Sequence, residues 1–279
     1  MLRKIQTPRY EAYLAGFRIP GIEFVDSPRL PSSIRPVWTA LQADAASAAA
    51  RNAESALLEN RLFGAEEKAG LLVGLAAAQL DEGRTVDAWE SSRKALDLFP
   101  HQLAGNHLQI MILSSRRDYV TAYERLESLV AIESPAIWDT TIDPVQKQLS
   151  LASFSWLCGQ WDQVAEHIEA AYPDGLTSMP DEIQEDCFRL ALYRNQADEA
   201  AQAAGLLIQR RPVELADEML QTFVQSGWTS QALPLYKDAF GRDPQSELLR
   251  RRLVALCIKE GQLDEARRLT APGALRTAA

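Results

Sequence analysis

Three histidines and three cysteines are the residues of this chain best suited to metal binding or nucleophilic chemistry. They are His101, His107, His167, Cys158, Cys187 and Cys257. No two of the cysteines have Cys-x-x-Cys spacing, and neither residue type is spaced like a set of zinc ligands. The sequence also lacks a glycine-rich phosphate loop, a nucleophile elbow and a dinucleotide-binding fingerprint. We therefore expect no catalytic centre, no metal site and no cofactor, and we interpret the cysteines as small apolar packing residues.

The strongest pattern is a six-residue phrase that recurs along the chain. Its copies are Gly83–Ala88, Arg117–Ala122, Gly159–Val164, Asn195–Ala200, Gly227–Ala232 and Gly261–Ala266. The final residues of the copies lie 34, 42, 36, 32 and 34 positions apart, and a period of this size is typical of stacked supersecondary units. Each copy stands between stretches whose apolar residues have helical spacing. The sequence therefore predicts a series of helix–turn–helix repeats.

The residue types of the phrase suit a tight turn between two helices. Gly or Asn at the first position can adopt the left-handed backbone with which many helices end. The Asp or Thr that follows can cap the next helix. A small last residue, such as Ala232, lets the second helix approach the first closely. Pro100, Pro212 and Pro244 each follow that small residue by twelve positions and stop the second helix.

This combination resembles the tetratricopeptide repeat family, whose pattern has a mid-repeat Gly, an Ala, an aromatic residue, a second Ala and a closing Pro. One copy matches all five positions, with Gly227, Ala232, Tyr236, Ala239 and Pro244. The resemblance covers residues 67–272 and implies an all-α fold, a right-handed α-solenoid of antiparallel helix pairs. Residues 37–66 could hold a degenerate first repeat. An irregular helical domain with accidental turn glycines is the alternative.

The N-terminal segment and one connection differ from the repeats. Residues 1–36 contain five prolines together with several aromatic residues, so we expect an arm that packs on this molecule or on a neighbour, with a flexible leader as the alternative. The longest interval between copies places an insertion around Glu133–Pro144, where Trp138 could contact a partner or pack on adjacent helices.

The C-terminal end of the array also differs. The last second helix can run only from Asp264 to Thr270, and residues 273–279 form a flexible tail. Solenoid ends normally carry a capping element. We therefore expect another protein surface to cover this end, and the apolar residues of the face would include Leu253, Leu256, Ile258 and Leu263.

The composition excludes several classes of partner. The net charge of −9 opposes binding to nucleic-acid backbones. No apolar run approaches the ~20 residues that span a bilayer, and the first residues do not form a secretory signal core. The cysteine pattern and the alanine-rich composition favour a bacterial cytoplasm.

The resemblance also implies where a partner would bind. In the family, bound peptides contact the first helix of each pair at fixed distances before the turn. Carried over to this chain, that frame selects His107, Met111, Gln146, Ser153, Trp156, Glu182, Glu185, Arg189, Tyr193, Glu214, Asp217, Gln221, Arg251 and Lys259. Its four carboxylates lie on adjoining repeats and would favour a basic partner segment. The Lys, Asn and Arg with which some family members clamp a terminal carboxylate are missing.

These expectations together predict a noncatalytic adaptor or assembly factor that binds a segment of a partner protein in a concave groove. Two alternatives remain open. The chain could be an accessory subunit that docks on a separate enzyme and stabilises it. It could also be a self-assembling structural scaffold, a homo-oligomer formed through the C-terminal end or the N-terminal arm.

Overall fold

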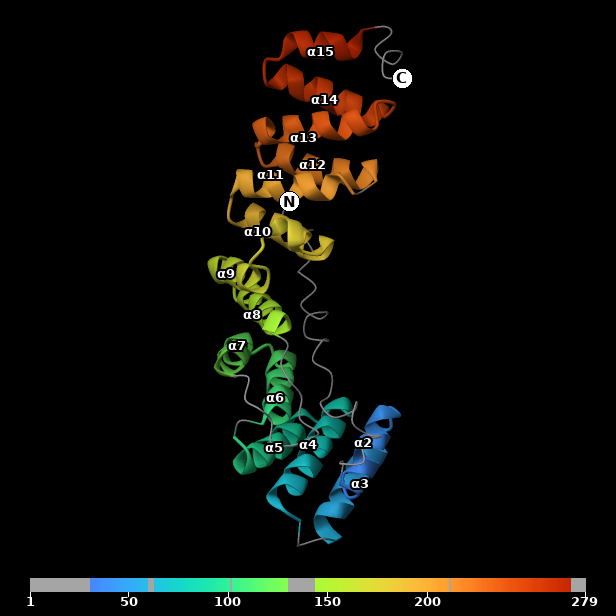
Figure 1. Cartoon of the computed structure of the whole chain (residues 1–279), viewed down its shortest axis with the longest axis vertical. Helices are drawn as coiled ribbons and strands as arrows, with labels where there is room; N and C mark the ends of the chain where they lie inside the picture. Colours follow the sequence, from blue (N-terminus) through green and yellow to red (C-terminus); the bar gives the residue numbers. More distant parts are fainter. Residues whose placement is uncertain (1–30, 60–62, 101, 130–143, 211, 272–279) are drawn as a thin grey trace. The chain divides into compact units, whose positions relative to one another are not determined.

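A computed structural model describes residues 31–59, 63–100, 102–129, 144–210 and 212–271, without the side chains of residues 213–215. Within these ranges the chain forms fourteen α-helices and no β-strand. The described residues form two compact units, residues 31–171 and residues 172–271. Within each unit consecutive helices pack against each other (Figure 1), as in a tetratricopeptide-like solenoid. The predicted all-α solenoid is therefore confirmed.

The expected N-terminal arm up to residue 30, most of the insertion with Trp138, and the tail of residues 273–279 lie outside the described residues. The described helices include none that is long and apolar enough to cross a membrane.

Residues 31–171 hold eight of the helices. They are α2 (Arg35–Gln42), α3 (Ala46–Glu59), α4 (Ala65–Asp81), α5 (Thr85–Leu98), α6 (Leu103–Ser115), α7 (Tyr119–Ser128), α8 (Pro144–Leu157) and α9 (Trp161–Ala171). Trp38 is fully buried in a cluster that α2, α3 and α4 share, and Phe154 is fully buried in a second cluster with residues of α6 and α7. Burial of these apolar faces is the main favourable contribution to the packing of the helices.

Residues 172–271 hold the other six. They are α10 (Asp181–Tyr193), α11 (Ala197–Ile208), α12 (Val213–Gln225), α13 (Thr229–Arg242), α14 (Glu247–Lys259) and α15 (Leu263–Thr270), and a short 3-10 turn, Leu176–Ser178, precedes them. Phe223 and Tyr236 are fully buried in one cluster to which all six helices contribute.

Left-handed residues end the first helix at every predicted turn. The φ angles are 76° at Gly83, 62° at Arg117, 73° at Gly159, 57° at Asn195, 83° at Gly227 and 75° at Gly261. After each of these residues, the next backbone N–H donates to the carbonyl five positions earlier, as from Arg84 to Gln79 at 2.8 Å. This bond closes the helix with a Schellman motif. The six predicted turns are confirmed.

A seventh turn of the same design joins α2 to α3. Asp44 has a φ of 54°, and the N–H of Ala45 donates to the carbonyl of Ala40 at 2.8 Å. Residues 35–59 thus form a helix pair like the others. Its first helix begins at Arg35, inside the range expected for the arm, and α4 begins at Ala65, inside the range expected for the degenerate repeat.

The position five residues after each turn is buried. Ala49, Ala88, Ala122, Ala200 and Ala232 are fully buried, and Val164 and Ala266 are nearly so. The small residue therefore faces the first helix of its own pair or the neighbouring helices, as the phrase predicts.

The capping prediction holds at Asp118, whose side chain accepts a hydrogen bond from the N–H of Thr121 at 3.3 Å. It is wrong at Thr85 and Thr229, which are the first residues of α5 and α13 and do not cap them. The cause is a shift of one residue, because the position directly after the left-handed residue is already the N-cap.

Helix α15 ends at Thr270, as predicted. The terminal apolar face was predicted too broadly. Leu253 and Leu256 are buried in the core of the unit, whereas Ile258 and Leu263 are 56% and 52% exposed.

Candidate partner-binding surface on the first helices

The predicted binding residues lie on the first helices of the pairs, which are α6 and α8 in residues 31–171 and α10, α12 and α14 in residues 172–271. Burial divides the described side chains among these residues into three groups. His107, Ser153, Trp156 and Asp217 are buried, while Glu182, Arg251 and Lys259 are exposed. The partly exposed ones are Met111, Gln146, Glu185, Arg189, Tyr193 and Gln221. The side chain of Glu214 lies outside the described part of the chain.

The buried members on α6 and α8 take part in packing. Burial lowers the pKa of His107 from 6.5 to about 3, so its imidazole is neutral at physiological pH. The hydroxyl of Ser153 donates to the carbonyl of Leu149 within α8 at 2.9 Å. Trp156 packs edge-on against Trp161 of α9, with ring centroids 5.3 Å apart. These side chains stabilise the helix pairs more than they offer surface to a partner.

Asp217 belongs to a polar network that joins α12, α13 and α14. The hydroxyl of Tyr236 donates to Asp217 Oδ1 at 2.9 Å, and Gln221 Nε2 donates to that hydroxyl at 2.5 Å. Arg252 Nε lies 3.6 Å from the same Asp217 oxygen. Burial raises the pKa of Tyr236 well above its usual range. The Asp217 carboxylate therefore already has a hydrogen-bond donor and a cation beside it within the protein.

Helix α10 carries the acidic part of the surface. Its carboxylates are Asp181, Glu182, Glu185 and Asp186, and Arg189 is its cationic residue. Arg189 bonds Glu185, and its Nη1 lies 3.3 Å from Asp186 Oδ1, so one guanidinium serves two carboxylates. Glu182 is exposed, and the helix retains negative charge at its surface.

Helix α14 has a basic surface, in contrast to the acidic surface of α10. Arg251 Nε donates to Glu247 at 2.8 Å, and Lys259 is exposed near the end of the helix. Ile258 lies exposed beside Lys259. The surface of residues 172–271 thus carries both positive and negative charge. The expectation from the sequence rested mainly on its carboxylates.

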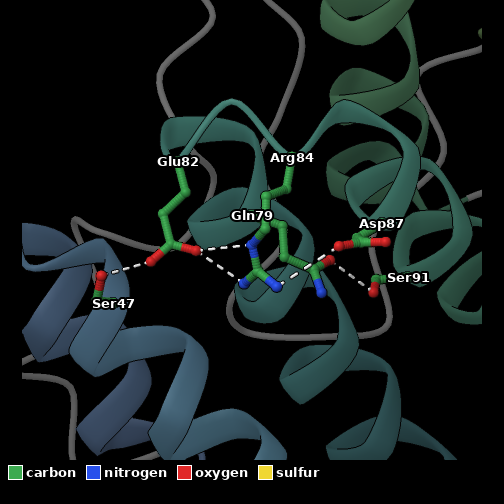
Figure 2. A network of polar contacts seen from close by, with 6 residues as sticks. All are labelled: Ser47, Gln79, Glu82, Arg84, Asp87 and Ser91. Atoms are coloured by element: carbon green, nitrogen blue, oxygen red, sulfur yellow. Dashed lines mark hydrogen bonds and ion pairs between the residues drawn. The ribbon is translucent and has the colours of Figure 1, made fainter.

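Polar contacts that the repeat spacing does not predict join neighbouring helix pairs. Figure 2 shows Glu82, at the end of α4, between Ser47 of α3 and Arg84. Ser47 Oγ donates to Glu82 Oε1 at 2.5 Å, and Arg84 donates through Nε and Nη2 to the other carboxylate oxygen, each at 2.8 Å. Arg84 Nη1 also lies 3.5 Å from Asp87.

A second contact beside this set is buried. In Figure 2 the hydroxyl of Ser91, on α5, donates to the side-chain oxygen of Gln79, on α4, at 2.8 Å. The bond satisfies both polar groups where α4 and α5 pack, so neither is left without a partner away from water.

The same kind of contact recurs at Glu260, which accepts hydrogen bonds from Thr229 and Ser230 at the start of α13. Glu82 and Glu260 both stand directly before a turn glycine, and Ser47 and Ser230 both stand third after a turn residue. Aligning the repeats on their turns reveals this correspondence once the left-handed turn at Asp44 is known.

The cysteines of the described chain are free thiols. Cys257 is buried, while Cys158 and Cys187 are partly buried. Burial raises the pKa of Cys158 and, as the largest effect, that of Cys257, which opposes formation of the reactive thiolate.

Comparison with known proteins agrees with this architecture. The tetratricopeptide repeat family model matches residues 223–278, which begin in α12 and include α13, α14 and α15. No curated protein matches the chain. The match of the family model confirms the resemblance to the tetratricopeptide repeat family for residues 223–278. Repeats of this family generally mediate protein–protein interactions and are typically noncatalytic.

Proposed function

We propose that the chain is a noncatalytic adaptor or assembly factor whose first helices bind a segment of a partner protein. The observation that carries the proposal is the exposure of predicted binding residues on α10 and α14 after the helices have packed. Glu182, Arg251 and Lys259 remain exposed, and these residues support neither the core nor a helix cap. A preformed helical surface can bind a segment without first ordering itself.

The acidic face of α10 favours a partner segment with a basic stretch. The frame residues Glu182 and Glu185 lie one turn apart on this helix, and Tyr193 lies partly exposed near its end. Carboxylates steer and orient a cationic segment, while a partly exposed tyrosine supplies amphipathic contact area. Asp217 contributes through Tyr236 and Arg252 to the shape of the surface rather than to its charge.

The test compares two substitutions that change the net charge equally. Glu182→Lys alters the proposed surface on α10. Asp238→Lys alters an exposed carboxylate on the second helix α13. Binding of a fluorescent hexalysine peptide should weaken several-fold more for the α10 variant, and added salt should weaken wild-type binding. Equal losses in the two variants would mean that the peptide senses only the overall charge.

We also propose a bacterial cytoplasm as the location, supported by the free thiols of the described residues. Copurification with one enzyme in a fixed ratio would favour the accessory-subunit alternative. Concentration-dependent size in solution would favour a homo-oligomer.

A further inference from the structure

Two arginines and a tryptophan lie close together between the second helix pair (α4 and α5) and the third (α6 and α7) of residues 31–171. Trp89 lies on α5, Arg116 directly follows α6, and Arg125 lies on α7. The guanidinium carbons of Arg116 and Arg125 lie 5.6 Å and 6.0 Å from the centroid of the Trp89 ring. Both cations are within the range of a cation–π interaction. We call these three residues the Trp89 cluster.

The hydrogen bonds of the cluster use neutral acceptors. Arg125 Nη1 donates to Asn106 Oδ1 at 2.9 Å, and Arg116 Nη2 donates to the backbone oxygen of Thr85 at 3.3 Å. Across the described ranges neither arginine forms an ion pair, although Arg84 and Arg93 in the same unit each pair with two carboxylates. The cluster therefore carries positive charge that these parts of the chain do not neutralise.

Arg125 has the least favourable environment of the three residues in the Trp89 cluster. Its Nε is buried and has no hydrogen-bond partner among the described residues. Burial also lowers the pKa of Arg125, because the charged form is held in a poorly solvated place. A buried donor without a partner and a partly buried charge without a counterion both destabilise a fold. A buried polar group without a partner is rare in folded proteins and calls for a structural or functional explanation.

Asn106 holds Arg125 in position. Its Nδ2 donates to the backbone oxygens of Pro100 and Gln102, at 3.1 Å and 2.8 Å. These two bonds fix the direction of the amide, and its oxygen then faces Arg125. The guanidinium is therefore oriented before a ligand arrives, which reduces the entropy lost on binding.

We propose that the Trp89 cluster is a docking site for an acidic segment of a partner protein, separate from the surface of the first helices. A carboxylate side chain binds Arg116 and the guanidinium edge of Arg125 other than its buried Nε, because guanidinium groups form directed, charge-assisted hydrogen bonds with carboxylates. The stem of that side chain packs on Trp89, which is partly exposed. Tryptophan and arginine are the residue types most enriched at the energetic centres of interfaces. In a chain of net charge −9, a local cationic site also selects one orientation for an acidic partner.

The probe is a fluorescent hexaglutamate peptide, titrated with the full-length wild-type protein and three variants. Arg116→Gln and Arg125→Leu should each weaken binding about tenfold or more. The matched control is Arg93→Gln, which removes a cation from the same helix as Trp89 but leaves the cluster unchanged, and its affinity should equal that of the wild type. Arg116 is exposed, so its variant folds even if the Arg125 variant does not.

Measurements of unfolding distinguish a docking site from a cluster that only stabilises the fold. Arg125→Leu should leave the midpoint of chemical unfolding unchanged or raise it, because it removes a partly buried charge that has no counterion among the described residues. A lower midpoint together with unchanged peptide affinity would overturn the proposal. So would the absence of saturable binding by the wild type up to about 1 mM peptide, or competition by inorganic phosphate as effective as that by the unlabelled peptide.

Discussion

Ser47 and Glu82 are 35 positions apart in the chain, yet the serine hydroxyl lies 2.5 Å from the carboxylate. Thr229 and Glu260, 31 positions apart, make the same kind of hydrogen bond in the other unit. In each case the acceptor precedes the turn glycine of one helix pair and the donor starts the second helix of the pair before it. Polar contacts between consecutive pairs thus add to the apolar contacts that hold them together.

The Ser47–Glu82 contact should make the stability of residues 31–171 depend on pH. The hydrogen bond from Ser47, followed by the contacts of Arg84, lowers the pKa of Glu82 below 4.5. A lowered folded-state pKa stabilises the fold above pH 4.5 and loses that contribution as the pH falls through the folded value. Ser47→Ala should therefore lower the unfolding midpoint at pH 7 and have a smaller effect in strong acid, where Glu82 is protonated in the folded protein. An equal effect at both pH values would show that the carboxylate charge is not involved.

Ala232 tests the close approach of α12 and α13. It is fully buried, and Ala232→Phe would overpack the core of residues 172–271. We expect a loss of roughly 1 to 3 kcal/mol or more in the free energy of unfolding. Gln245→Ala, at an exposed position, should change little. Denaturant unfolding measures both variants, and a nearly unchanged midpoint for Ala232→Phe would contradict the packing.

Substitutions at two left-handed turn residues should change the free energy of unfolding in opposite directions. Gly227 has a φ of 83°, and a Cβ added there would meet no atom within 4 Å, so Gly227→Ala isolates backbone strain and should cost about 1 kcal/mol. Arg117 already bears that strain at a φ of 62°. Arg117→Gly should therefore stabilise its unit, by up to about 1 kcal/mol. Both changes are measurable by chemical unfolding, and changes of the same sign would be inconsistent with the turn geometry.

A substitution at Gly74 tests how the second helix pair packs against the first. A Cβ added at Gly74 of α4 would lie 2.5 Å from Val37 Cγ1 of α2, and Val37 is fully buried. Gly74→Ala should destabilise residues 31–171 by about 1 to 3 kcal/mol. Adding Val37→Ala should recover part of that loss, because it removes the clashing methyl group. A double-mutant cycle measures the coupling, and purely additive effects would mean that α2 does not pack there.

The turns were predictable because their chemistry is local. A left-handed backbone strongly favours Gly or Asn. At Arg117 neither residue is present, and the turn is predicted there from the repeat period alone. The turn at Asp44 was not recognised, because no copy of the phrase marks it. The small buried residues followed from the same register.

The binding surface was less predictable because it depends on side chains from neighbouring helices. Helical spacing assigns Asp217 to the first-helix face but does not reveal that Tyr236, on the next helix, donates to it. The Trp89 cluster likewise depends on how far the side chains of Arg116 and Arg125 reach toward the Trp89 ring. Long side chains that cross between helices decide which charges remain free, and a repeat register contains no information about them.

Site-specific photo-crosslinking in the native host tests whether the first helices bind the partner. A photoreactive amino acid replaces Lys259 on the first helix α14 or, as the control, Asp238 on the second helix α13; both positions are exposed. We expect one specific crosslinked protein at position 259, weakened by Glu182→Lys in the same chain, and none at position 238. Equal crosslinking at both positions, or crosslinking at position 259 that is unchanged by the charge reversal on α10, would show that the partner does not bind on the first helices.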